Sequence, residues 1–285
     1  MSVTSSDILV QAAYTGSFTL LAQKLADGAD PDALGDVDGL QGTPLLAASF
    51  RGHDSCVQAL LEGRAQFDLP GRGGDWDTPL YNASIAGQLE CVRLLIDAGA
   101  QLHGHEFPPL YVAASHGQHS CVHLLLEAGA SADEPVEDGF NPLCIAAEHG
   151  YAACVQALVD GRADVNYQLA DLGNPLWLAA QGQHEEGDSG VEVNEEDAAG
   201  SYEECVSILL AANASVDGAR AGDDMSTPLY VAAQNGHESV LRLLLEAGAD
   251  RTITRFDGET PKEGACRNEH EGCVRLLNRN QQRRR

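Results

Sequence analysis

Apolar positions along this chain recur in a pattern that favours short helices arranged in pairs. The clearest second helices read CVRLLI at 91–96 and CVHLLL at 121–126. Their apolar residues cover more of the circumference than a half-exposed helix needs, so we expect packing on two sides. A shorter helix containing paired small residues precedes each of them. The pattern therefore predicts an all-α chain in which helix pairs stack on one another.

A proline-containing phrase marks the start of each first helix. Thr-Pro-Leu occurs at 43–45, 78–80 and 227–229, and four variants bring the prolines to 44, 79, 109, 142, 175, 228 and 261. The intervals are 35, 30, 33, 33, 53 and 33 residues, and we interpret the longest as one period of 33 plus an insertion of 20. A proline-free first unit begins near Asp7. Self-similarity at this period indicates a repeat architecture.

The local chemistry of each unit fits a helix–turn–helix. Thr or Asn is a good N-cap, and proline suits the first helical turn. Four residues after proline stands an alanine, at 48, 83, 113, 146, 179, 232 and 265. The second helix closes at residues that tolerate a left-handed backbone, Gly28, Gly99, Gly129, Asn213 and Gly248. Arg64 and Arg162 take that place in two units, at an expected cost in strain.

These phrases resemble the ankyrin repeat, whose motif reads TPLHxAAxxGHxxxVxLLLxxGA. The resemblance covers residues 5–280 in about eight repeats. It implies an ankyrin-repeat solenoid of stacked helix–turn–helix units joined by β-hairpin loops. It also implies a protein-binding function, exercised through the hairpin tips and the inner helix face.

Departures from the motif refine the resemblance. Tyr81, Tyr111, Trp177 and Tyr230 replace the usual histidine. TPLY combined with CVxLLLxAGA is similar to the repeats of ankyrin-and-SOCS-box adaptors, which implies a ubiquitin-ligase adaptor. The chain runs only a few residues past its last predicted helix, which leaves no room for a SOCS box. We therefore interpret this similarity as one of repeat style.

Charge restricts the partners. The chain has 17 basic and 43 acidic residues and a net charge of −26. Such a field repels nucleic acid and attracts basic protein segments. No apolar run reaches 18 residues, so we expect no membrane span. The N-terminus has no secretory features, and we expect a cytoplasmic monomer; the basic tail at 281–285 leaves the nucleus as an alternative.

Residues that could carry chemistry do not form a reactive site. Six of the eight cysteines share one column, and we expect them to be free, small buried hydrophobes in a reducing compartment. His119 and His123 have metal-ligand spacing without a third ligand, while His53 and His237 belong to the structural turn of the motif. No phosphate loop or nucleophile elbow occurs. We therefore predict no catalytic residue, no metal and no cofactor, and the chain is not expected to be an enzyme.

Two sets of residues are candidates for partner binding. The hairpin set comprises Asp75, Trp76, Asp77, Phe107 and Phe140, and Met225 lies at the corresponding tip of a later repeat. Its four large apolar side chains are unusual for loop tips, which are normally polar. The inner-helix set follows the paired small residues and comprises Ile85, His116, Glu148, His149 and Asn235. As an alternative, the apolar tips cover the seam between units. A partner with a basic and partly apolar segment would fit both sets.

Two further segments carry hypotheses. The insertion at 183–200 in the sixth repeat is acidic, contains no basic residue and is expected to be flexible. It is either a tolerated surface loop or a regulatory segment that blocks a basic site on an enzyme. The sequence LVDGRADVN resembles sites of asparaginyl hydroxylation, which implies Asn166 as the acceptor; an ordinary hairpin asparagine is the alternative. The sequence as a whole predicts a scaffold or adaptor, with a ubiquitin-ligase substrate receptor or such a regulator as alternatives.

Overall fold

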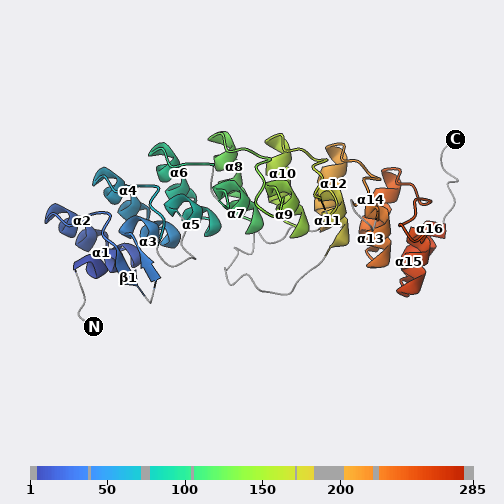
Figure 1. The fold of residues 1–285 in the computed structure, drawn as a ribbon, viewed down its shortest axis with the longest axis horizontal. Helices are drawn as coiled ribbons and strands as arrows, with labels where there is room; N and C mark the ends of the chain where they lie inside the picture. The colour runs from blue at the N-terminus through green and yellow to red at the C-terminus, as the bar shows by residue number, and fades with distance from the viewer. Residues whose placement is uncertain are drawn as a thin grey trace. The chain divides into compact units, whose positions relative to one another are not determined.

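The computed structural model describes residues 5–37, 40–71, 78–103, 106–170, 172–182, 202–220 and 225–278. It divides the chain into two compact units, residues 1–131 and 132–285. Within each unit the described residues form helix pairs, in which an inner helix is followed by an outer helix (Figure 1). The 16 helices of the described residues confirm the predicted repeat of short helix pairs.

The first unit contains four pairs and a short sheet. Its inner helices are α1 (Ser5–Tyr14), α3 (Pro44–Arg51), α5 (Pro79–Ile85) and α7 (Pro109–Ser115). Its outer helices are α2 (Phe18–Ala26), α4 (Asp54–Glu62), α6 (Leu89–Asp97) and α8 (His119–Glu127). Strands β1 (Gly35–Val37) and β2 (Leu40–Gly42) pair antiparallel as a hairpin between the first two repeats, with Asp36 opposite Gln41.

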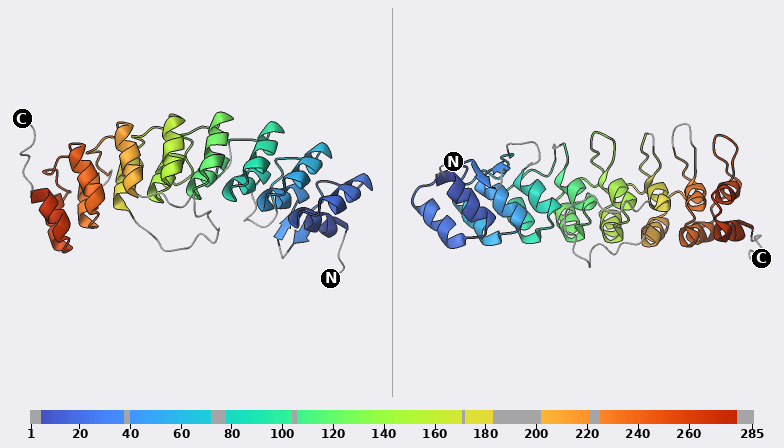
Figure 2. Two further views of the ribbon diagram at one scale, coloured as in Figure 1. Left: turned by 180° about the vertical axis from the view of Figure 1, so that it is seen from behind. Right: turned by 90° about the horizontal axis from the view of Figure 1, so that it is seen from below.

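The second unit also contains four pairs. Its inner helices are α9 (Pro142–Glu148), α11 (Pro175–Gln181), α13 (Pro228–Gln234) and α15 (Pro261–Arg267). Its outer helices are α10 (Ala152–Asp160), α12 (Tyr202–Ala211), α14 (Glu238–Glu246) and α16 (Glu271–Asn278). The loops at 132–140 and 250–260 leave this unit on the same side (Figure 2). The insertion at 183–200 and the tail at 281–285 lie outside the described residues.

The predicted caps are present. Thr43 Oγ1 accepts the backbone N–H of Leu46 at 3.2 Å, and Asn141 Oδ1 accepts that of Cys144 at 2.9 Å. Each bond satisfies an N–H that the first helical turn leaves without a partner. The last repeat has a full capping box between Thr260 and Glu263. The Thr/Asn-Pro phrase therefore starts the inner helices as expected.

The small-residue column and the left-handed helix ends are also confirmed. The predicted alanines of the inner helices are buried, including Ala113 and Ala146 at 0% exposure. The outer helices end at left-handed residues, with φ of 96° at Gly129, 65° at Arg64 and 67° at Arg162. Small side chains let neighbouring helices approach closely, and the left-handed residue turns the chain into the hairpin.

The cysteine column belongs to the core. Cys56, Cys91, Cys121, Cys154, Cys205 and Cys273 are free and buried, as is Cys144, whereas Cys266 is exposed. Burial raises the pKa of Cys205 to about 12 and that of Cys273 to about 11. These thiols therefore stay protonated and act as small apolar side chains.

Hairpin carboxylates tie successive repeats together. Asp32 Oδ1 accepts the backbone N–H of Gln66 at 2.8 Å, one repeat further along. Asp68, Asp133 and Asp217 make the same bond to the backbone 33, 31 and 33 residues later. This ladder of acceptors fixes the spacing of neighbouring hairpins within each unit.

Candidate protein-binding surface

The inner helices end in residues that reach the surface. His149 and Asn235 are exposed, whereas Ile85, His116 and Glu148 are half-buried. Ile85 and His116 lie in the first unit and the others in the second, so the predicted set forms two separate groups. In both groups the preceding small residues are buried in the helix stack, which places the next residues at the edge of the inner layer.

His116 is held in a fixed orientation. Its Nδ1 lies 3.0 Å from the carbonyl oxygen of Val112 and 2.9 Å from Ser115 Oγ. Burial lowers the pKa of His116, so the ring is neutral at physiological pH. His116 is therefore a neutral ring in a fixed orientation, without positive charge.

Asn235 also has a structural role that the sequence did not reveal. Its Nδ2 donates to the carbonyl oxygen of Gln181 at 2.9 Å, and His237 Nε2 lies 2.9 Å from the same oxygen. In the first unit, His53 Nε2 lies 3.0 Å from the carbonyl oxygen of Tyr14. The interpretation of His53 and His237 as structural is thus confirmed, and Asn235 shares their function of linking successive inner helices.

Several apolar side chains at the hairpins are solvent-exposed. Phe107 is 38% exposed and lies beside Tyr111, with ring centroids 6.0 Å apart. Met225 is 49% exposed, while Phe140 is half-buried. Phe256 is 60% exposed, and the sequence analysis did not select it, although an aromatic residue directly before Asp-Gly was a visible signal. Asp75, Trp76 and Asp77 lie outside the described residues.

Two aromatic residues in place of the motif histidine contact the hairpins of the second unit from within the core. Trp177 is buried, and its Nε1 donates to Ser226 Oγ at 3.2 Å. The guanidinium of Arg220 lies 5.5 Å from the centroid of the Trp177 ring. Such cation–π contacts add to the stability of the loop that supplies the arginine.

Tyr230 makes similar contacts one repeat later, in the same unit. Its hydroxyl donates to Glu259 Oε2 at 2.7 Å and accepts from Arg255 at 3.2 Å and Arg267 at 3.3 Å. The Arg255 guanidinium lies 5.4 Å from the Tyr230 ring and 5.5 Å from the Phe256 ring. Burial raises the pKa of Tyr230. The cluster therefore fixes the hairpin that presents Phe256.

Asn166 is exposed, but its amide is part of the ladder between hairpins. Its Oδ1 accepts the backbone N–H of Ser215 at 2.7 Å, and its own N–H donates to Asp164 Oδ1 at 2.9 Å. Leu158, which belongs to the hydroxylation-like phrase, is buried. Asn166 is thus accessible at the surface while its side-chain oxygen is engaged.

In the ranges that the structure describes, no three His, Cys, Asp or Glu side chains gather as metal ligands. No helix that the structure describes is long and apolar enough to cross a lipid bilayer. The exposed features of this part of the chain are apolar tips, carboxylates and a few arginines.

Comparison with known proteins identifies similar chains. A sequence model of ankyrin repeats matches residues 9–105, 110–187 and 197–283 in three copies. The chain is 40% identical over 53 residues to the probable E3 ubiquitin-protein ligase XBOS33 of Oryza sativa subsp. japonica, which covers 19% of this chain and 10% of that protein. The chain thus spans a small fraction of that relative. The chain superimposes on the crystal structure of the human ASB11 ankyrin repeat domain with a TM-score of 0.68 and 25% sequence identity. The match covers 84% of this chain and 99% of that domain.

Proposed function

Because the chain belongs to the ankyrin repeat family, we propose that it is a non-catalytic scaffold or adaptor that binds another protein through its hairpin tips and inner-helix ends. The observation that carries this proposal is the exposure of Phe107, Met225 and Phe256, at 38%, 49% and 60%, on hairpins. Large apolar side chains in water are favourable binding anchors, because burying each one against a partner releases solvent.

Charge selects the partner. Acidic residues accompany the exposed tips, as Asp257 accompanies Phe256, and the whole chain carries −26. A partner segment that combines apolar side chains with Lys or Arg would be attracted by the field and held by the anchors. The partner is therefore proposed to be a protein with a basic, partly apolar segment, bound by a monomer in the cytoplasm.

A capture experiment with matched variants tests this function. Phe107→Ala removes an anchor that is 38% exposed on a hairpin, and Leu89→Ala removes a side chain that is 37% exposed on α6. We expect crosslinked capture from lysate to lose a specific protein with Phe107→Ala and with Phe256→Ala, and to keep it with Leu89→Ala. Partners that bind all three variants equally would contradict the proposed tips.

A ubiquitin-ligase substrate receptor is the second candidate. It is favoured by the similarity to the ASB11 ankyrin repeat domain and to a probable E3 ubiquitin-protein ligase. In that case the captured material should contain a cullin scaffold alongside a substrate. A third candidate, a regulator that uses its acidic insertion, is tested in the same assay by deleting residues 183–200. Loss of the partner only on that deletion would favour the regulator.

A further inference from the structure

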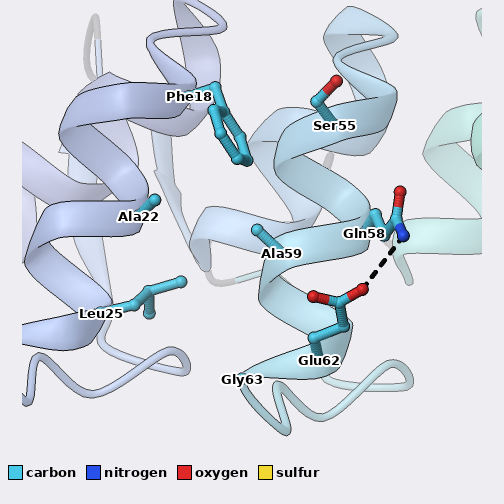
Figure 3. Close-up of a pocket in the computed structure, with 8 residues that line it drawn as sticks. All are labelled: Phe18, Ala22, Leu25, Ser55, Gln58, Ala59, Glu62 and Gly63. Atoms are coloured by element: carbon cyan, nitrogen blue, oxygen red, sulfur yellow. Dashed lines mark hydrogen bonds between the residues drawn. The ribbon is translucent and has the colours of Figure 1, made fainter.

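A groove lies between two outer helices, α2 and α4, at the start of the first unit. Its volume is 420 Å³, and Figure 3 shows the side chains that line it. Apolar atoms come from Phe18, Ala22 and Leu25 on α2 and from Ala59 on α4. Phe18 is 47% exposed, so solvent reaches this apolar surface. The groove is separate from the hairpins and from the inner-helix ends.

Both helices that line the groove carry alanine where most other repeats carry larger side chains; α10 also has alanine, Ala157, at the position of Ala59. When the repeats are aligned on the Cys-Val pairs at 56–57 and 91–92, Ala59 is equivalent to Leu94 of α6. When α2 and α4 are aligned from their first residues, Ala22 is equivalent to Gln58. Since packed helices normally leave few voids, two truncated positions at one groove leave room for side chains from outside the chain.

The end of the groove carries a carboxylate. One oxygen of Glu62 accepts a hydrogen bond from Gln58 Nε2 at 3.0 Å, and its second oxygen is available to accept another (Figure 3). The net charge of −26 adds a field of the same sign. A positively charged group beside the apolar floor would therefore be attracted, and an acidic one would be repelled.

We propose that this groove binds an amphipathic helix of another protein, which inserts apolar side chains between α2 and α4 and places Lys or Arg beside Glu62. The proposal rests on the protein-binding function and gives it a second surface, on the outer helices. From Phe18 to Leu25 the lining extends over two helical turns, about 10 Å at 1.5 Å per residue. Helices recognised in grooves use anchors with this spacing, one or two turns apart.

The test uses a phage-displayed library of 20-residue peptides, selected on the full chain. Ala59→Leu fills the groove with the side chain that α6 has at the equivalent position. Ala157→Leu is the matched control, because residues 154–158 of α10 repeat the sequence CVQAL of residues 56–60. We expect selected peptides with apolar anchors and a basic residue one turn away. Ala59→Leu should weaken their binding at least tenfold, about 1.4 kcal/mol, and Ala157→Leu should not.

A second variant keeps the test independent of folding. Phe18→Ala alters a half-exposed side chain, so the helix stack should remain intact while peptide binding falls severalfold. Glu62→Gln should weaken basic peptides and spare neutral ones. Failure to select peptides, or selection of peptides insensitive to both Ala59→Leu and Phe18→Ala, would overturn the proposal.

Other occupants give their own signatures. Self-association in sedimentation that Ala59→Leu abolishes would assign the groove to a second copy. Tighter peptide binding after removal of residues 279–285 would assign it to the chain's own basic end. Either result overturns the proposal of a separate partner. Capture of a lysate partner that depends on Phe107 but not on Ala59 would leave the proposed function intact while refuting this inference.

Discussion

Arginine occupies a left-handed backbone position at the end of two outer helices, and replacement by glycine should stabilise the protein. Arg64 has φ of 65° and Arg162 has φ of 67°. The corresponding residue in other repeats is glycine, such as Gly129 with φ of 96°. Both arginines are exposed, so the backbone conformation dominates the effect of replacing them.

The magnitude follows from two opposing terms. A left-handed conformation costs a residue with a Cβ about 1–2 kcal/mol. Glycine avoids that cost, but its greater freedom in the unfolded chain costs about 0.4–1 kcal/mol. Arg64→Gly and Arg162→Gly should therefore each stabilise the fold by about 0.5–1 kcal/mol. Equilibrium unfolding in urea, followed by circular dichroism, measures this as a higher midpoint.

Two controls separate the backbone from the side chain. Arg64→Ala removes the guanidinium but keeps the Cβ, so its stability should stay within about 0.5 kcal/mol of the parent. Gly129→Ala is the reverse change, and an added Cβ there meets no atom within 4 Å. It should destabilise by about 1 kcal/mol through the backbone alone. If Arg64→Gly is no more stable than Arg64→Ala, the strain argument is wrong.

The other predictions follow from the described contacts. Ala113→Leu should overpack the inner layer and lower the stability by about 1–3 kcal/mol, measured by thermal denaturation. Asp217→Ala removes an acceptor between hairpins and should cost about 1 kcal/mol in urea unfolding. Cys266 alone should react quickly with a thiol reagent in the native chain, because it is the exposed cysteine. The pKa of Cys205 is raised from 9.0 to about 12 in the folded chain. The free energy of unfolding should therefore fall as the pH rises through this range, because the thiol ionises first in the unfolded chain. Treatment with an asparaginyl hydroxylase should add one oxygen at Asn166, detected by mass spectrometry and absent in Asn166→Gln; an unmodified parent chain would contradict the hypothesis.

Much of the fold could be predicted from the sequence because its determinants are local. Thr43 caps α3 through a residue three positions away, and the left-handed Arg64 and Arg162 follow from their place in the repeat. The column of cysteines could be predicted as buried because the same position recurs with the period of the repeat. A repeated local rule identifies a helix pair each time it occurs, so agreement among repeats strengthens the prediction.

The candidate site was harder to predict because exposure depends on how hairpins meet their neighbours. Asn235 was predicted to face a partner, yet its amide binds the carbonyl oxygen of Gln181, which is 54 residues away in the sequence. Phe256 was overlooked, although it is more exposed than Phe107. No local pattern distinguishes an aromatic residue that covers a seam from one that projects into solvent. That distinction requires the positions of neighbouring repeats.

The arginine–aromatic contacts of the second unit order a hairpin that we propose as a binding tip. A loop that is ordered only on binding loses conformational freedom at that moment, which subtracts from the affinity. Arg255 contacts the rings of Tyr230 and Phe256, and Tyr230 also binds Glu259, so both sides of the hairpin are attached to α13 before a partner arrives. Phe256 is thereby presented on an ordered loop. In the proposed binding mode, the aromatic residue that replaces the motif histidine would contribute from within the core, without touching the partner.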